Sequence, residues 1–333
     1  MYLKDLLRYR NAWLGFAMLW VVLYHLPFSF GGGAFAFFKS LGYAGVDICM
    51  FASGIGCYYS LHSESDVGVF IKKRLNRIMP TYLVFMIFWL VYQWRLGAFN
   101  LPMAIGNIFA VQQLTGNAGS FNWYISAILL FYFFAPYFKT LVDRTSRLGN
   151  TLFLSFLILV TIPFWNSNNM IIIVTRLAIF YIGMLLAKLC KADVKISAKY
   201  IVLAVLMFLA GCVSIWYFWT YLSAFKWSHG LYWYPFILVT PPLCMAISLI
   251  SMLLEKSKIT KVISWLLSIC GAYSFEIYLV HIPFLTLVPL LIKKYSLESK
   301  GYILWLASGV LVIVGCFVLK GIITLWGKRK KQS

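Results

Sequence analysis

Long apolar runs separated by short polar segments make up most of the sequence. A helix that crosses the hydrocarbon core of a bilayer needs about 20 mostly apolar residues, and ten runs approach or exceed that length. We therefore expect an all-α, polytopic membrane helix bundle, with residues 1–333 forming a single integral membrane domain. The ten expected spans are residues 11–30, 41–61, 78–96, 122–138, 151–166, 170–187, 199–221, 233–254, 263–292 and 301–326.

The connections between these runs are short. The longest, residues 97–121, contains a short apolar stretch at 103–111, which we interpret as a re-entrant or interfacial segment. No connection is long enough for an extramembrane domain, and the sequence has no internal repeat of the inverted kind found in many transporters. We therefore expect the function to lie inside the membrane or at its two surfaces.

Composition supports the membrane assignment. Hydrophobic residues make up 62% of the chain and charged residues only 11%, with a mean hydropathy of +0.85. Soluble domains carry about 25% charged residues, and no soluble domain of this size could bury so much apolar surface. The seven cysteines are scattered through apolar segments without metal-ligand spacing, so we expect no metal site.

The net charge is +20, from 29 Lys and Arg against 9 Asp and Glu. In a soluble chain this excess would suggest a nucleic-acid partner, but here 21 of the bases fall at the termini and in alternate connections, against six in the others. Cytoplasmic loops are enriched in Lys and Arg. We therefore expect both termini in the cytoplasm, a multi-pass protein of the cell (plasma or inner) membrane, and no nucleic-acid partner.

Few ionisable side chains fall inside the expected spans, and each is a functional candidate because a charge in hydrocarbon is costly. At about 1.5 Å of rise per residue, His25, Asp47 and Arg176 each lie about 9 Å from the expected outer face, and Glu276 falls in the same layer. We expect Lys320, near the inner end of the last span, to snorkel to the interface. His281 completes the set.

This layer has two interpretations. In the first it is a structural cluster, in which Arg176 neutralises Asp47 and Glu276 while His25 is a hydrogen-bonded core histidine. In the second it is a water-accessible site, in which a carboxylate orients His25 and stabilises its protonated form.

Helical geometry separates the polar residues of the ninth span into two faces. Ser274, Tyr278 and His281 share one face, whereas Glu276 points about 140° away from His281. We expect the Ser/Tyr/His face to line the site and Glu276 to be paired with a base or protonated, because both faces cannot look into one narrow pocket.

With these residues in view, the chain resembles the acyltransferase-3 family of integral membrane acyltransferases. Five matches fall in order over residues 11–284: GFAMLWVVLYH ending at His25, GVDI at residues 45–48 with Ser53-Gly54, FIKKRLNRIMPTY at residues 70–82, NWY at residues 122–124 with Tyr132 and Pro136, and SFEIYLVH ending at His281. Arg176, Phe180 and Gly183 form a looser match. The family has an Arg eleven positions before its histidine, where this chain has Leu14; Arg10 lies one turn earlier, about 60° from His25 in projection.

The resemblance implies transfer of an acyl group, most often acetyl, from cytoplasmic acyl-CoA to a hydroxyl of a cell-surface glycan or lipid-linked saccharide, with membrane lipids as the other partner. Acyl-CoA is then a substrate, and no cofactor is tightly bound. His25 is the expected general base, with Asp47 orienting or charging it. The expected donor-binding residues are Lys73, Arg74, Arg77 and Tyr82, and the expected substrate-binding residues are Trp123, Tyr124, Arg176, Ser274, Tyr278 and His281.

Several alternatives stay open. The bases at residues 72–77 are also explained by positive-inside signalling alone, and Trp123 and Tyr124 by interfacial anchoring. Ten spans with polar residues at mid-depth also suit a transporter or flippase for a glycan or lipid-linked intermediate. The Leu14 substitution favours a third possibility, a non-catalytic relative.

Overall fold

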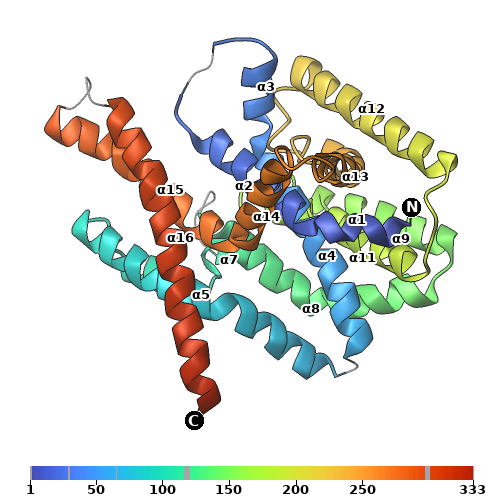
Figure 1. The fold of residues 1–333 in the computed structure, drawn as a ribbon, viewed down its shortest axis with the longest axis horizontal. Coiled ribbons are helices and arrows are strands. Elements are labelled where there is room, and N and C mark those ends of the chain that lie inside the picture. The colour runs from blue at the N-terminus through green and yellow to red at the C-terminus, as the bar shows by residue number, and fades with distance from the viewer. Residues whose placement is uncertain (1, 29–30, 65, 116–120, 297–300, 333) are drawn as a thin grey trace.

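The computed structural model describes residues 2–28, 31–64, 66–115, 121–296 and 301–332, and within these ranges it is helical with no strand (Figure 1). The predicted all-α, polytopic fold class is therefore confirmed. The main helices are α2 (Arg10–His25), α4 (Gly45–Ser63), α5 (Val67–Arg95), α8 (Trp123–Arg144), α9 (Arg147–Leu159), α11 (Leu177–Lys191), α12 (Ala198–Tyr221), α13 (Pro235–Leu254), α14 (Lys261–Ala272), α15 (Ser274–Tyr295) and α16 (Gly301–Gln332). The shorter ones are α1 (Leu3–Leu6), α3 (Ala34–Ser40), α6 (Leu101–Ile108), α7 (Gln112–Thr115) and α10 (Ile171–Val174).

Eight helices in the described part of the chain are long and apolar enough to cross a membrane, or nine if the bent pair around Leu41 counts as one span. The first expected span corresponds to α2, which has 16 residues and is not among the eight, each of which spans at least 18 residues. The expected single span at 263–292 is divided at Tyr273 into the short α14 and the long α15. Residues on both sides of this break line the candidate active site.

The connection at 97–121 contains the short helix α6, close to the predicted apolar segment. Asn100 caps its first turn by accepting a hydrogen bond from the backbone N–H of Met103 (3.0 Å). Asn122 Nδ2 donates to the Tyr82 hydroxyl (2.7 Å), and that hydroxyl donates to the backbone carbonyl of Asn107 at the end of α6. Residues 116–120 lie outside the described part of the chain.

Glycines allow the central helices to approach at backbone distance. A Cβ atom at Gly54 of α4 would collide with the carbonyl oxygen of Phe180 on α11, and one at Gly183 would collide with the carbonyl of Phe51. In lipid, helix association depends on close packing rather than on the hydrophobic effect, and small residues permit it. The α4–α11 contact therefore lies at the centre of the bundle.

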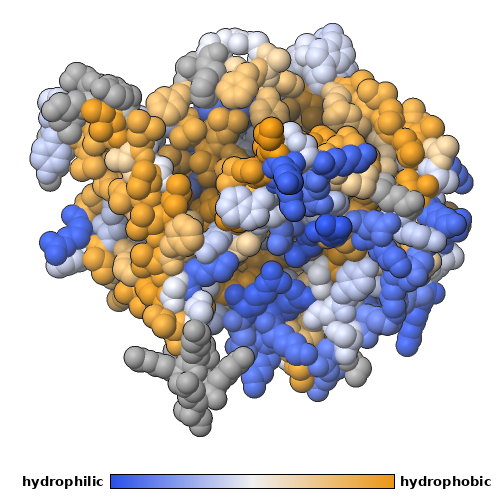
Figure 2. Space-filling view, viewed as in Figure 1, coloured by the Kyte–Doolittle hydropathy of each residue, from blue (hydrophilic) through white to orange (hydrophobic). Residues whose placement is uncertain are grey.

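Connections that the charge pattern assigns to one side of the membrane lie together in space. Lys4 pairs with Asp193 after α11 (2.7 Å), and Arg8 pairs with Glu255 after α13 (3.3 Å). Figure 2 shows hydrophilic side chains gathered in the lower centre and at the right of this face, whereas the upper and left parts are mainly hydrophobic. This separation is typical of a protein whose sides face lipid.

We predict that Gly54→Val destabilises the bundle, because the added methyl groups must push α4 away from α11. Overpacking of this kind costs about 1–3 kcal/mol. The apparent melting temperature in detergent should fall by several degrees. Gly309→Val is the matched control, since a Cβ at Gly309 meets nothing within 4 Å; equal melting temperatures for the two variants would contradict this packing.

Candidate active site

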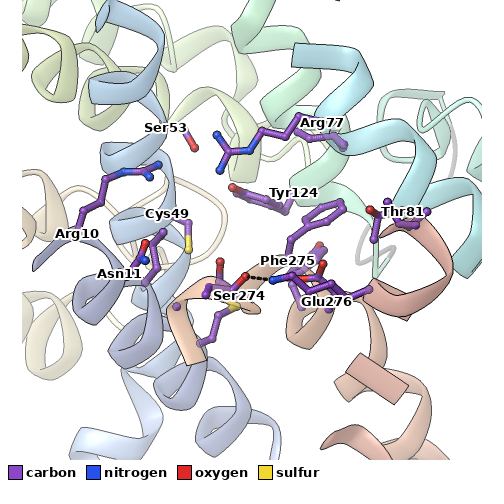
Figure 3. Close-up of a pocket in the computed structure, with 18 of the residues that line it drawn as sticks. Arg10, Asn11, Cys49, Ser53, Arg77, Thr81, Tyr124, Ser274, Phe275 and Glu276 are labelled. Carbon is purple, nitrogen blue, oxygen red and sulfur yellow. Dashed lines mark hydrogen bonds between the residues drawn. The ribbon is translucent and has the colours of Figure 1, made fainter. Parts of the chain in front are cut away.

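A cavity of about 380 Å³ lies where α2, α4, α5, α8, α14, α15 and α16 meet (Figure 3). Arg10 and Arg77 extend into it from opposite sides, with Ser53 and Tyr124 between them and Ser274 and Glu276 across from these. The polar and sulfur-containing side chains around it are those of Arg10, Asn11, Met18, Cys49, Ser53, Arg74, Arg77, Thr81, Tyr124, Tyr132, Ser274, Glu276, Tyr278, Lys320 and Thr324.

The cavity is strongly basic. Arg10, Arg74, Arg77 and Lys320 line it, against the single acid Glu276. Arg74 is buried, donates to the carbonyl of Gly56 on α4 (2.6 Å) and packs against aromatic rings, so its guanidinium is held in place. Arg77, one turn along α5, is exposed and free to meet a ligand. The predicted pairing of these two arginines on one site is thus matched by their geometry.

Arg10 brings a guanidinium group to the cavity on the same face of α2 as Leu14, which stands where the family has an arginine. Both residues line the cavity on the same face of α2, and Arg10 Nη2 donates to the carbonyl of Ala52 (3.3 Å). The Nε atom of Arg10 is buried without a hydrogen-bond partner among the described residues. The chain therefore has an arginine in this cavity despite the Leu14 substitution, because one helical turn returns the side chain to nearly the same face.

Lys320 corrects a sequence prediction. We expected it to snorkel to the interface, but it lines the cavity, donates to the carbonyl of Ala272 at the end of α14 (2.7 Å) and lies 3.8 Å from the Tyr273 ring centroid. The break between α14 and α15 leaves that carbonyl without a helical donor, and Lys320 supplies one. The available signal was a lone base inside the last span.

Glu276 corrects a second prediction. It shares the cavity with Ser274 and Tyr278, although a helical wheel puts it on another face. The reason is that α15 begins at Ser274 beside the cavity, so the successive residues Ser274, Phe275 and Glu276 of its first turn all line it. The interpretation in which Arg176 neutralises Glu276 is also wrong, since Arg176 pairs with Asp47 and Glu276 shares the cavity with Lys320 and Arg77.

Two expected donor-binding residues lie outside the cavity lining. Lys73 pairs with Glu64 at 3.0 Å, and this hydrogen bond lowers the pKa of the Glu64 carboxyl. Lys73 is four residues before Arg77 and lies near the same helical face, so its pairing with Glu64, rather than the helical face, separates it from the cavity. Tyr82 is fully buried and ties α5 to α6 and α8 through its hydroxyl.

His25 and His281 form a pair beyond the end of the cavity that Met18 and Tyr278 line. Their ring centroids are 5.2 Å apart. Nδ1 of His25 lies 2.9 Å from the carbonyl of Val21, and Nδ1 of His281 lies 2.9 and 2.8 Å from two carbonyls of its own helix. A carbonyl can only accept, so each Nδ1 carries the proton and each Nε2 keeps its lone pair. His25 is exposed, whereas Nε2 of His281 is buried without a described partner.

The histidine pair and the cavity share two helices. On α2, Met18 lines the cavity and His25 follows on the same face, about 10 Å further along. On α15, Tyr278 lines the cavity and His281 follows one turn later. The Tyr278 ring is 6.1 Å from that of His281, and its hydroxyl donates to the carbonyl of Phe121. The histidine pair therefore lies next to the cavity along both helices, although neither histidine lines it.

Asp47 does not bind His25. It is buried and pairs with Arg176 at 3.4 Å, and no hydrogen bond among the described residues joins it to His25. The Arg176 guanidinium lies between the rings of Trp123 (5.1 Å) and Trp233 (4.4 Å), and it donates to the carbonyl of Ile172 (2.8 Å). For these two residues the structural interpretation therefore describes the geometry better than a His–carboxylate pair.

The adjacent aromatic residues of the NWY match have different surroundings. Trp123 packs on Arg176 outside the cavity, whereas Tyr124 lines the cavity and lies 5.1 Å from the Tyr278 ring. The residues Asn11, Cys49, Ser53 and Thr81 also line the cavity. Ser53 and Thr81 fall within the segments that carry the family resemblance, but Asn11 and Cys49 had no signal of their own in the sequence.

The family model of acyltransferase-3, described as an acyltransferase domain, matches residues 11–321. No curated protein and no solved structure matches the chain. The matched segment begins one residue after Arg10 and includes the histidine pair, the buried ion pair and nearly all of the cavity.

We predict that Arg176→Met destabilises the protein, because it leaves the Asp47 carboxylate buried without its partner. Loss of one member of a buried ion pair costs about 3–5 kcal/mol. The double variant Asp47→Leu with Arg176→Met should recover much of this loss, as measured by the apparent melting temperature in detergent. A double variant no more stable than Arg176→Met would show that the two charges are not coupled.

Proposed function

The chain belongs to the acyltransferase-3 family of membrane acyltransferases, and we propose that it transfers an acetyl group from cytoplasmic acetyl-CoA to a hydroxyl of a cell-surface glycan or lipid-linked saccharide. The observation that carries the proposal is the basic cavity together with the His25–His281 pair, which follows its lining residues along α2 and α15. The arrangement separates a site for an anionic donor from a site for proton transfer.

Arg10, Arg74 and Arg77 suit the phosphates of CoA. Guanidinium groups bind phosphate through two parallel, charge-assisted hydrogen bonds. The volume of about 380 Å³ falls in the range of small-molecule sites. The phosphates bind near the exposed Arg77, and the pantetheine arm runs past Cys49 and Tyr124 toward Tyr278.

The sidedness follows from the charge pattern. With both termini in the cytoplasm, the cavity end that carries Arg10 and Arg77 faces the cytoplasm of a cell-membrane protein, where acyl-CoA is available. His25, at the far end of α2, then faces the acceptor on the opposite side. The acyl group passes from the cytoplasmic side to the opposite side, while CoA stays on the cytoplasmic side.

In the reaction, Nε2 of His25 removes the proton from the acceptor hydroxyl as its oxygen attacks the thioester carbonyl. A carbon–oxygen ester bond forms, the carbon–sulfur bond breaks, and the CoA thiolate takes up the proton from His25. The Nδ1 contact of His25 with the Val21 carbonyl supports this role, because it leaves Nε2 unprotonated. We assign the hydroxyl of Tyr278 to the developing oxyanion, in exchange for its bond to Phe121.

Asp47 and Arg176 have a positioning role in this proposal. Their pair joins α4 to the start of α11, and α4 carries Cys49 and Ser53 into the cavity. Trp123 and Trp233 hold the guanidinium from both sides. Neither charged group is assigned a proton-transfer step.

We predict that Arg77→Ala weakens acetyl-CoA binding at least about tenfold, because a charge-assisted hydrogen bond contributes about 1.5–3 kcal/mol. Adding Arg74→Ala should weaken it further. Lys73→Ala is the matched control, since Lys73 is four positions before Arg77 on α5 but pairs with Glu64. Calorimetry on purified protein measures each dissociation constant. Equal affinities for Arg77→Ala and Lys73→Ala would remove Arg77 from the donor site.

We predict that His25→Ala lowers acyl transfer about 10²–10⁴-fold, as expected for loss of a general base, with acetyl-CoA affinity unchanged. Release of free CoA thiol in the presence of candidate saccharides measures the rate. His62→Ala, at the far end of α4, should retain wild-type activity. Transfer by His25→Ala at the wild-type rate would overturn the proposed mechanism, and a wild type that binds acetyl-CoA without transfer would favour the non-catalytic alternative.

A further inference from the structure

A second cavity, of about 310 Å³, is lined by three of the helices that also line the basic cavity, namely α5, α15 and α16. On α5, α15 and α16 the basic cavity is lined within residues 74–81, 274–278 and 320–324, and the second within residues 85–92, 280–287 and 311–319. The two cavities therefore follow each other along one set of helices, which lie at the left of the molecule in Figure 1. We call the second cavity the apolar groove, because its lining is aliphatic and aromatic.

The apolar groove has a buried floor and an exposed rim. Phe85, Val280 and Leu319 are buried at its floor, whereas Phe88 and Val314 at its rim are 57% and 49% exposed. The helices α5, α15 and α16 are all long and apolar enough to cross a membrane. The exposed rim therefore faces hydrocarbon, and the groove opens sideways to the bilayer.

One polar group interrupts the apolar lining. The Tyr92 hydroxyl is buried and has no hydrogen-bond partner among the described residues. An unpaired buried hydroxyl is unfavourable, and aliphatic or aromatic neighbours cannot satisfy it. A ligand that carries an oxygen atom beside its hydrocarbon chain would do so, as a lipid with a phosphate or ester linkage does.

The apolar groove also adjoins the histidine pair. Val280 lies in its floor and directly precedes His281, and Pro283 continues the lining just after it. The ring of His281 is 5.2 Å from that of His25. The floor of the apolar groove therefore lies close to the proposed base.

We propose that the apolar groove binds the hydrocarbon chain of a lipid-linked saccharide, which is the acceptor of the acyl group, and that Tyr92 donates a hydrogen bond to its linkage oxygen. This inference rests on the proposed function and narrows its acceptor to the lipid-linked form. A chain that leaves bulk lipid gains no hydrophobic free energy on entering the groove. Selection among lipids therefore depends on packing and on the Tyr92 hydrogen bond.

Photocrosslinking in vesicles tests the proposal. Full-length protein is reconstituted in phosphatidylethanolamine and phosphatidylglycerol with a trace of one of two probes, each with a diazirine in its chain: a polyprenyl-phosphate-linked monosaccharide or a phosphatidylglycerol. Mass spectrometry locates adducts on α5, α15 and α16 peptides. We expect the saccharide probe to label the apolar groove at least about fivefold more than the phospholipid probe, the excess that one better-placed hydrogen bond to Tyr92 supplies.

Two variants fix the site of labelling. Gly315→Leu places a side chain in the groove and should abolish the excess labelling. Even the Cβ atom of the new side chain would lie 3.3 Å from Phe284. Gly309→Leu, on the same helix, has open space around it and should leave the labelling unchanged. Tyr92→Phe keeps the shape of the groove and should lower saccharide-probe labelling about fivefold. If Gly315→Leu does not fold, the Tyr92→Phe variant alone tests whether the labelled site is the apolar groove.

Equal labelling by the two probes, or excess labelling that survives both Gly315→Leu and Tyr92→Phe, would overturn the proposal. The crosslinking needs no donor and no turnover, so it is independent of the acyl-transfer assay. Selective labelling without acetyl-CoA binding would overturn the proposed function alone. Transfer to a water-soluble saccharide with unselective labelling would overturn the apolar groove alone.

Discussion

The contact between α4 and α11 positions the helix on which the cavity depends. The two backbones meet through glycines, and the buried Asp47–Arg176 pair lies in the same interface. Two backbone carbonyls of α4 in turn accept hydrogen bonds from Arg10 and Arg74, on the helices to either side. Any shift of α4 would displace both guanidinium groups. The α4–α11 contact takes no part in the proposed reaction, but it sets the geometry of the basic cavity.

The bilayer explains why polar and apolar cavities can follow each other on three helices. In hydrocarbon a polar side chain needs a partner within the protein, so the charged lining of the basic cavity is confined to one end of α5, α15 and α16. The remaining turns of these helices are apolar and meet lipid directly. Tyr278 and Leu319 mark the change from one environment to the other, and His281 lies just beyond it.

Particular residues show how far the sequence could predict the site. Arg74 and Arg77 were identifiable because they lie in the basic segment at residues 70–82 that resembles the family, and His25 because so few ionisable groups fall inside the spans. Glu276 was misplaced because the interpretation assumed an unbroken helix at 263–292, and Lys320 because only its place near the inner end of the last span was considered. The break at Tyr273 brings the first turn of α15 to the cavity and leaves the Ala272 carbonyl to Lys320.

The sequence by itself determined the class of fold, the membrane environment, the grouping of basic connections on one side and the family. These properties follow from composition, from apolar run length and from spacing along single helices, all of which are local. Tertiary structure alone decided that Asp47 pairs with Arg176 rather than with His25, that His25 meets His281, and that Arg10 occupies the cavity beside Leu14. The physical reason is that helices in a bilayer share nearly the same depth scale, so residues of equal depth have many possible partners. Only the packing of helices against one another selects which of them meet.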